Sequence, residues 1–171
     1  MAAITPAQAQ AYLDSIDRQI ARVVIDAFNQ GLLVSLRRSV TAYMQGGGSK
    51  ALPNPPPGPL RIRSGRLRRG VRVVPAQQIA RDVFRGGLGV NLGEVPYARI
   101  HELGGKTSAH EILPRNKKAL RFFVGGQAVF SKRVHHPGSL IPTRPFLRPA
   151  VRDTIPDIRS RIDAALSRLA R

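Results

Sequence analysis

Histidine pairs are the residues of this sequence that could most readily hold a metal ion and activate water. In three places a histidine is followed by a glutamate or a second histidine: His101–Glu102, His110–Glu111 and His135–His136. A zinc-protease helix needs two histidines four positions apart with a glutamate between them, and neither His–Glu pair has its second histidine. A site that joins His110, His135 and a distant carboxylate remains open, as does metal-dependent nuclease chemistry at the His–His pair. No acid lies between positions 112 and 152 to supply that pair with carboxylate ligands, so we expect no metal and no cofactor.

The other common catalytic signatures are missing from the sequence. The chain has no cysteine, which excludes disulfides, thiolate metal sites and cysteine nucleophiles. It contains no G-x-S-x-G motif, and the GGGSK run at 46–50 only superficially resembles a phosphate-binding loop. The GGLG run at 86–89 lacks the spacing of a dinucleotide-binding motif. These absences predict a protein that is not an enzyme.

Charge is the most unusual property of the composition. The 171 residues include 28 Lys or Arg and only 10 Asp or Glu, for a net charge of +18. No acid occurs between Asp26 and Asp82, so the positive charge belongs to the middle of the chain. Such a field predicts an acidic partner, which could be nucleic acid, membrane lipid or an acidic protein surface. Aromatic residues make up only 5% of the chain, which argues against a single-strand binder built on stacked bases.

The densest positive charge lies at residues 60–75, LRIRSGRLRRGVRVVP. Apolar residues alternate there with arginines, which indicates a half-exposed strand, and Ser64–Gly65 indicates a turn. We interpret the cluster as the best candidate for contact with DNA or an acidic partner, although a merely solvated strand face would look the same. The six candidate residues are Arg61, Arg63, Arg66, Arg68, Arg69 and Arg72.

A helical pattern runs from a capping box at Thr5 to about Met44. Its apolar residues form two stripes, and the second is rotated by roughly 140° from the first at about 100° per residue. We therefore expect a break or bend near Gly31, or an arm that packs on a neighbouring subunit; two ordinary core helices are the alternative. The second stripe supplies candidates for an oligomer interface, namely Leu33, Leu36, Val40, Tyr43 and Met44.

The remaining pattern predicts an α+β fold with a mostly antiparallel sheet. Strands are expected at 60–75 and 79–92, with a glycine bulge near 86–87, and a hairpin is expected to turn at Gly125–Gly126. An amphipathic C-terminal helix, kinked at Pro156, should lie on the sheet. We divide this single domain into an N-terminal helical segment (1–45), a Gly/Pro-rich loop (46–59) and an α+β core (60–171). No apolar run approaches the length of about 20 residues that spans a bilayer, so no membrane partner is expected.

Two polar segments look structural rather than catalytic. Prolines in the segment PTRPFL (142–147) fix the start of the last helix, where an apolar anchor and an arginine could hold the chain. A second segment, YARIHELGG (97–105), reads as one helical turn stopped by glycines. The expected structural anchors are Tyr97, Glu102, Gly104, Arg144, Pro145 and Phe146.

Four segments in this order resemble the tail-completion and minor-tail (virion morphogenesis) proteins of long-tailed phages. They are SGRLR (64–68), YARIHELGG (97–105), ILPRNKKAL (112–120) and RPFLRPA (144–150). The resemblance covers about residues 60–171, together with the general position of the long first helix.

The resemblance implies a non-enzymatic virion protein of the neck or head-proximal tail end, which completes the tail and joins it to the capsid. It implies a tail-terminator-like fold, a ring that is most simply a homo-hexamer, and partners among head-closure (stopper), tail-terminator and tail-tube proteins. DNA in the channel is a further expected contact. The alternative is a basic nucleic-acid-binding protein, which would bind DNA as an isolated monomer in a salt-dependent way.

Overall fold

The computed structural model describes residues 5–46 and 58–171, so most of the loop expected at 46–59 lies outside the described residues. The first part of the chain holds α1 (Pro6–Ala42), β1 (Met44–Gln45), β2 (Leu60–Arg61), α2 (Arg66–Gly70), β3 (Val71–Ala80) and β4 (Val83–Val90). The middle holds α3 (Ala98–Leu103), β5 (Gly105–Lys106), β6 (His110–Ile112), β7 (Leu120–Val124), β8 (Gln127–Ser131), β9 (Val134–His136) and β10 (Leu140–Ile141). Last come α4 (Arg148–Arg152) and α5 (Ile155–Leu169). The α+β prediction is confirmed.

Helix α1 runs unbroken through 37 residues, about 55 Å at 1.5 Å per residue. It begins with the predicted capping box: the Thr5 amide donates to Gln8 Oε1 at 2.9 Å, and the Gln8 amide donates to Thr5 Oγ1 at 3.3 Å. The predicted break near Gly31 is wrong, because the helix continues through it. Gly31 is instead a point of close contact with α5, and a Cβ there would lie 2.4 Å from Ile158 Cγ1.

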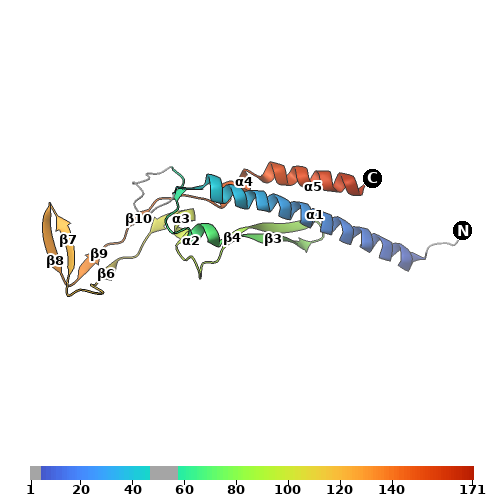
Figure 1. Ribbon diagram of the computed structural model, residues 1–171. Helices are drawn as coiled ribbons and strands as arrows, with labels where there is room; N and C mark the ends of the chain where they lie inside the picture. Colours follow the sequence, from blue (N-terminus) through green and yellow to red (C-terminus); the bar gives the residue numbers. More distant parts are fainter. Residues whose placement is uncertain (1–4, 47–57) are drawn as a thin grey trace.

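Helix α1 is the central element of the body (Figure 1). The β3–β4 hairpin packs on one side of it, and α4 and α5 pack on the other. The predicted C-terminal helix therefore packs chiefly on α1 and not on the sheet. It is also two helices, because the chain turns at Asp153–Thr154 and Pro156 lies in the first turn of α5. The amphipathic stripe was correctly predicted, but the element that it packs against was not.

The main core cluster lies at the C-terminal end of α1. Its members are Met44, Leu60, Leu67, Val71, Val95, Ala98 and Phe146. This cluster corrects the predicted oligomer interface: Met44 is buried in it, and Leu36, Val40 and Tyr43 are partly buried against it. Only Leu33, with 58% of its surface exposed, remains open to a partner. The second stripe is rotated because the C-terminal end of α1 packs against this core cluster of the same chain.

The described strands form five two-stranded sheets and no larger one. The short β1–β2 pair is parallel, and the other four pairs are antiparallel. In the β3–β4 pair the register shifts between Val74, opposite Gly87, and Gln77, opposite Arg85. The extra residue thus lies on β3 beside Pro75, and not on the glycine strand where we expected the bulge. Residues 66–70, expected within a strand and turn, form the helical turn α2.

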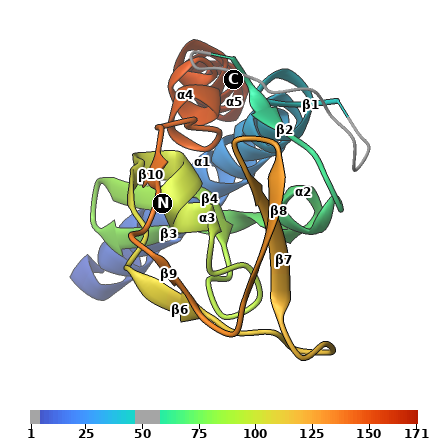
Figure 2. The ribbon, with the colours of Figure 1, turned by 90° about the vertical axis from the view of Figure 1, so that its left-hand side faces the viewer.

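Two parts of the chain project from the body at opposite ends (Figure 1). The β arm, defined here as residues 105–141, carries the pairs β5–β10, β6–β9 and β7–β8 in succession away from the body. In the view along the long axis the β7–β8 hairpin lies in front of the body, nearest the viewer (Figure 2). At the other end α1 continues past the β3–β4 hairpin, and we call its residues 6–20 the helical end. Among the described helices, none is long and apolar enough to cross a membrane.

Candidate functional site: an arginine-lined cavity

The local fold explains why the arginines at 61–69 face outward. Gly65 has φ +72°, a conformation that suits glycine, and it begins the helical turn α2. The Arg69 amide donates to the Gly65 carbonyl at 3.0 Å. The turn buries Leu67 in the core, so the remaining side chains of α2 are directed to its solvent side.

These arginines surround a cavity of about 750 Å³ between α2, the β1–β2 pair and α3. Its described lining consists of Met44, Leu60, Arg61, Ile62, Arg63, Ser64, Gly65, Arg66, Leu67, Arg68, Tyr97, His101 and Arg144. Five arginines and no carboxylate occur in this set. Guanidinium groups donate hydrogen bonds in a fork that matches carboxylate and phosphate oxygens. The cavity is therefore suited to an anionic group, with apolar side chains beside it.

Four of the six predicted arginines line the cavity, and two do not. Arg72 pairs with Glu94 at 3.3 Å on the protein surface, so its charge is already matched. Arg69 folds back toward Gly65, and its Nη1 lies 3.0 Å from the point that a Cβ added at Gly65 would occupy. The fifth cavity arginine, Arg144, comes from a segment about 80 residues further along the chain, and the sequence analysis had assigned it only a structural role.

The second wall of the cavity is formed by α3 and the chain before α4. The Tyr97 and His101 rings lie edge to face, with their centroids 5.9 Å apart. The Arg144 amide donates to the His101 carbonyl at 2.8 Å, which ties this segment to α3. Burial, and then the charge of Arg144, hold the pKa of His101 below its usual value of 6.5. Near neutral pH His101 is thus an uncharged hydrogen-bonding group in a positively charged cavity.

Acidification should destabilise the protein through His101. Because its folded pKa lies below 6.5, the unfolded chain binds the proton more tightly, and stability falls as the pH drops from about 7.5 through 6.5. We expect the melting temperature of the His101→Gln variant to fall less than that of the wild type over this interval. The His110→Gln variant is the control, because His110 is exposed on the β arm. Equal pH dependence of the wild type and His101→Gln would contradict this prediction.

Glu102 lies directly behind this wall and fixes the start of α4. Its Oε2 accepts the amides of Phe146 and Leu147 at 2.7 and 3.0 Å, and its Oε1 accepts the Arg148 amide at 3.0 Å. Phe146 itself is fully buried, whereas the neighbouring Pro145 is exposed.

The glycine that ends α3 is also held against the segment before α4. Gly104 has φ +72°, and a Cβ there would lie 2.6 Å from Thr143 Oγ1. The predicted structural anchors thus lie at one junction, where Glu102 and Phe146 are buried, Tyr97 and Pro145 are exposed, and Tyr97 and Arg144 line the cavity.

The histidines of the β arm do not converge on a metal site. In the β6–β9 pair, His135 Nδ1 lies 2.9 Å from Glu111 Oε1, while His110 stacks on His136 with ring centroids 4.9 Å apart. Successive strand residues point to opposite faces, so His110 and His135 are on different sides of the pair. Among the described residues no three metal-ligating side chains gather at one point. The site left open between His110, His135 and a carboxylate is therefore not formed.

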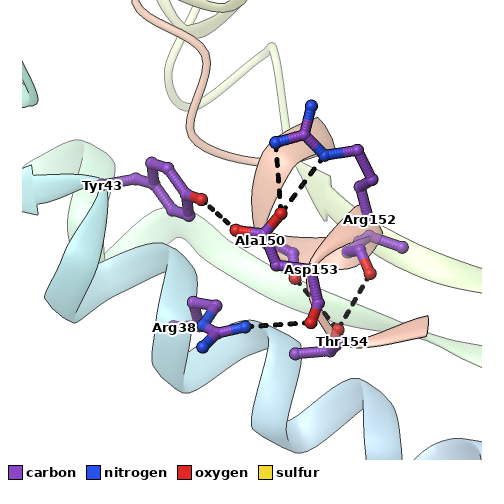
Figure 3. A network of polar contacts seen from close by, with 7 residues as sticks. Arg38, Tyr43, Ala150, Arg152, Asp153 and Thr154 are labelled. Atoms are coloured by element: carbon purple, nitrogen blue, oxygen red, sulfur yellow. Dashed lines mark hydrogen bonds and ion pairs between the residues drawn. The ribbon is translucent and has the colours of Figure 1, made fainter. Parts of the chain in front are cut away.

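A polar network that the sequence analysis missed joins the C-terminal helices to α1 (Figure 3). Tyr43 donates its hydroxyl proton to the Asp153 carboxylate, and Arg38 Nη1 donates to the Asp153 carbonyl at 3.0 Å. The hydrogen bond from Tyr43 lowers the pKa of Asp153 and raises that of Tyr43. Ser35 and Thr154 share a second, buried hydrogen bond. These contacts span more than 100 residues, so no local pattern could have predicted them.

Comparisons with known protein families, with curated proteins and with solved structures find no match to this chain.

Proposed function

We propose that this protein is a structural subunit of a phage particle, located in the neck or at the head-proximal end of the tail. There it completes the tail and joins it to the capsid as part of a ring. The observation that carries the proposal is the exposure of large apolar side chains at both projecting ends of one elongated subunit. Contiguous exposed apolar surface marks contact sites with other molecules, and a subunit with such surface at both ends is suited to assembly.

Two of the four segments that carry the family resemblance support the proposal through their arrangement. YARIHELGG (97–105) forms α3 and its glycine stop, and RPFLRPA (144–150) forms the start of α4. The two segments meet through the three hydrogen bonds that Glu102 accepts. Motifs distant in sequence thus build one structural unit, as expected of residues shared within a family for a common fold.

The arginine-lined cavity is consistent with the same proposal. A neck ring surrounds DNA in transit and stacks on other rings, so it faces phosphates or acidic protein surfaces. Both partners present oxygen anions that guanidinium groups bind in pairs. We expect the partners to be head-closure (stopper), tail-terminator and tail-tube proteins, with a homo-hexamer as the form of the ring and the virion as its location.

Quantitative mass spectrometry of nuclease-treated phage particles tests the proposal directly. The copy number of this protein is calibrated against that of the portal protein in the same particles. We expect the copies of one ring per particle, near six, because closed rings are the simplest assemblies of repeated head-to-tail contacts. Absence of the protein from purified particles would overturn the proposal.

Charge reversal should separate assembly from folding. Changing Arg66, Arg68 and Arg69 to glutamate is expected to lower the yield of joined particles by about a hundredfold, because like charges facing one another cost several kcal/mol. The melting temperature of the isolated protein should be almost unchanged, since charges on exposed surface contribute little to stability. A triple reversal of Arg159, Arg168 and Arg171 on or just after α5 makes the same change in net charge and serves as the control. Normal joining by the first variant would refute a role for α2 in joining.

A basic nucleic-acid-binding protein is the second candidate, favoured by the net charge of +18 and the cavity's five arginines. It predicts that the isolated monomer binds duplex DNA with an affinity that falls linearly, on logarithmic axes, as salt rises. Binding titrations from 50 to 200 mM salt distinguish the two candidates. A steep salt slope together with absence from particles would favour this candidate over the neck protein.

A further inference from the structure

We propose that the β7–β8 hairpin of one copy docks on the helical end of the next copy, in a head-to-tail contact. The inference rests on the proposed function, because it specifies the contact that links neighbouring subunits of the ring. It commits to one partner, a second copy of this chain, and to two surfaces of that chain.

The hairpin is apolar on both faces and packs extensively against no other described element. On one face Phe123 and Phe130 are 65% and 66% exposed, and Arg121 lies over the Phe123 ring at 5.2 Å. On the other face Val124 is exposed as well, opposite Gln127. A strand with apolar residues on both faces is typical of sheets that are covered on both sides. A two-stranded hairpin is also marginally stable alone, so this element should acquire its covering layers from outside the subunit.

The helical end offers a matching surface. Leu13, Ile16 and Ile20 follow one another at spacings of three and four, so they form one stripe of α1. Asp17 lies in the same stripe and pairs with Arg81 at the tip of the β3–β4 hairpin at 3.3 Å. The helix beyond this pair extends past the sheet, which leaves Leu13 56% exposed. The stripe is therefore uncovered where the chain's own sheet ends.

The tip of the sheet extends this surface. Ile79 and Val83 flank the β3–β4 turn, and both are exposed. Because the Asp17–Arg81 pair holds the tip against α1, the apolar side chains of the helix and the tip belong to one end of the subunit. A hairpin docked there could contact α1 with one face and approach the sheet tip with its edge.

The charges of the β arm and of the helical end have opposite signs. The β arm carries seven Lys or Arg residues and a single acid, Glu111. The helical end carries Asp14 and Asp17 against Arg18, and because Asp17 is paired with Arg81, Asp14 is the acid left for a partner. A contact between two hairpins would bring two strongly basic arms together, whereas a hairpin on the helical end of another copy pairs opposite signs. The two surfaces lie at opposite ends of one copy (Figure 1), so they meet only between copies. Such a head-to-tail contact closes a ring when the rotation between neighbours fits.

Disulfide trapping tests the contact cleanly because the chain has no cysteine of its own. Ala128 lies opposite Phe123 on the hairpin and is exposed. A full-length protein carrying Ala128→Cys is mixed with one carrying Leu13→Cys, and in a second mixture with one carrying Ile20→Cys. Oxidation should yield the mixed dimer as the main product, since a disulfide needs Cα atoms within about 7 Å. A predominance of the Ala128→Cys homodimer, or no cross-link at about 1 mM protein, would overturn the docking.

Substitution of the aromatic residues gives a second, independent readout. The double variant Phe123→Ser/Phe130→Ser should raise the concentration needed for oligomer formation at least thirtyfold, the effect of losing one aromatic hot spot. The double variant Leu92→Ser/Leu103→Ser is the matched control, because it removes two exposed leucines outside the β arm and the helical end. Native mass spectrometry measures the oligomers, and the melting temperature of each dilute variant shows that it folds. An unchanged oligomer distribution in the phenylalanine variant would refute the proposal.

These outcomes also distinguish the docking from the proposed function. If the mixed disulfide dimers form but the protein is absent from phage particles, the proposed contact stands and the neck assignment is wrong. If particles contain the protein at about the copy number of one ring, but the Phe123→Ser/Phe130→Ser variant still forms normal oligomers, the neck assignment stands and the proposed contact is wrong.

Discussion

Replacing Glu102 by alanine is expected to lower the free energy of unfolding by about 3 kcal/mol, because it removes several hydrogen bonds to a charged group. The buried carboxylate accepts three successive backbone amides, from Phe146, Leu147 and Arg148. The Phe146 amide lies in the interior, and alanine leaves it with no acceptor from residue 102. An unsatisfied buried donor loses its hydration without compensation, and this loss dominates the effect.

Chemical denaturation and thermal unfolding measure this loss. For a chain of this size about 3 kcal/mol corresponds to a fall in melting temperature of roughly 6–12 °C. The Glu102→Gln variant retains one acceptor oxygen and should lose less. Glu111→Ala is the matched control. Both glutamates pair with an arginine, Glu102 with Arg148 at 3.5 Å and Glu111 with Arg133 at 3.7 Å, but the Glu111 carboxylate is exposed and its pair should contribute less than about 1 kcal/mol. Equal stability of the Glu102 and Glu111 variants would contradict the role given to the three amides.

Elements defined by neighbouring residues were predictable from the sequence. The capping box at Thr5, the glycine stop after α3 and the Gly125–Gly126 turn each depend on residues a few positions apart. Both turn glycines have positive φ, which a two-residue hairpin turn favours. Local chemistry decides these features, and the structure confirms them.

Features decided by distant contacts were not predictable in the same way. An amphipathic stripe shows that a helix is covered on one face, but it does not identify the covering element. The C-terminal stripe was therefore assigned to the sheet, although it packs on α1. In the same way, Leu36 and Val40 were assigned to a partner although the chain's own core covers them.

The candidate site contains both kinds of feature, those set by neighbouring residues and those set by distant contacts. The arginines at 61–68 were predictable as a group because they are adjacent in sequence. Arg144 joins them because its segment is tied to α3, by its own amide on the His101 carbonyl and by the amides that Glu102 accepts. Sequence spacing carries no signal for these contacts. Likewise, Arg72 was grouped with the cluster by position, but Glu94 neutralises it from across the surface.

Replacing Gly31 by alanine is expected to destabilise the protein by about 2 kcal/mol, the usual cost of overpacking a well-packed contact. In an ordinary helix interior this change stabilises by about 1 kcal/mol, because alanine is the better helix former. Here the new Cβ would lie 2.4 Å from Ile158 Cγ1 and 3.2 Å from the Ile158 Cα. The α5 backbone would have to move away from α1, and the loss of packing exceeds the gain in helix propensity. Urea denaturation of the wild type and the variant measures the difference.

A double-mutant cycle with Ile158→Ala separates close packing from helix bending as the reason for glycine at this position. Ile158→Ala removes Cγ1, the atom at 2.4 Å, and leaves the Cα and Cβ at 3.2 Å, so the cost of Gly31→Ala should fall to near zero in the Ile158→Ala background. The coupling between the two substitutions should reach about 2 kcal/mol, as for residues in direct contact. If Gly31 instead provided a point of bending, alanine would restrict α1 regardless of Ile158, and the loss would persist in both backgrounds. The cycle therefore tests whether α1 is one rigid element that carries the helical end to a neighbouring subunit.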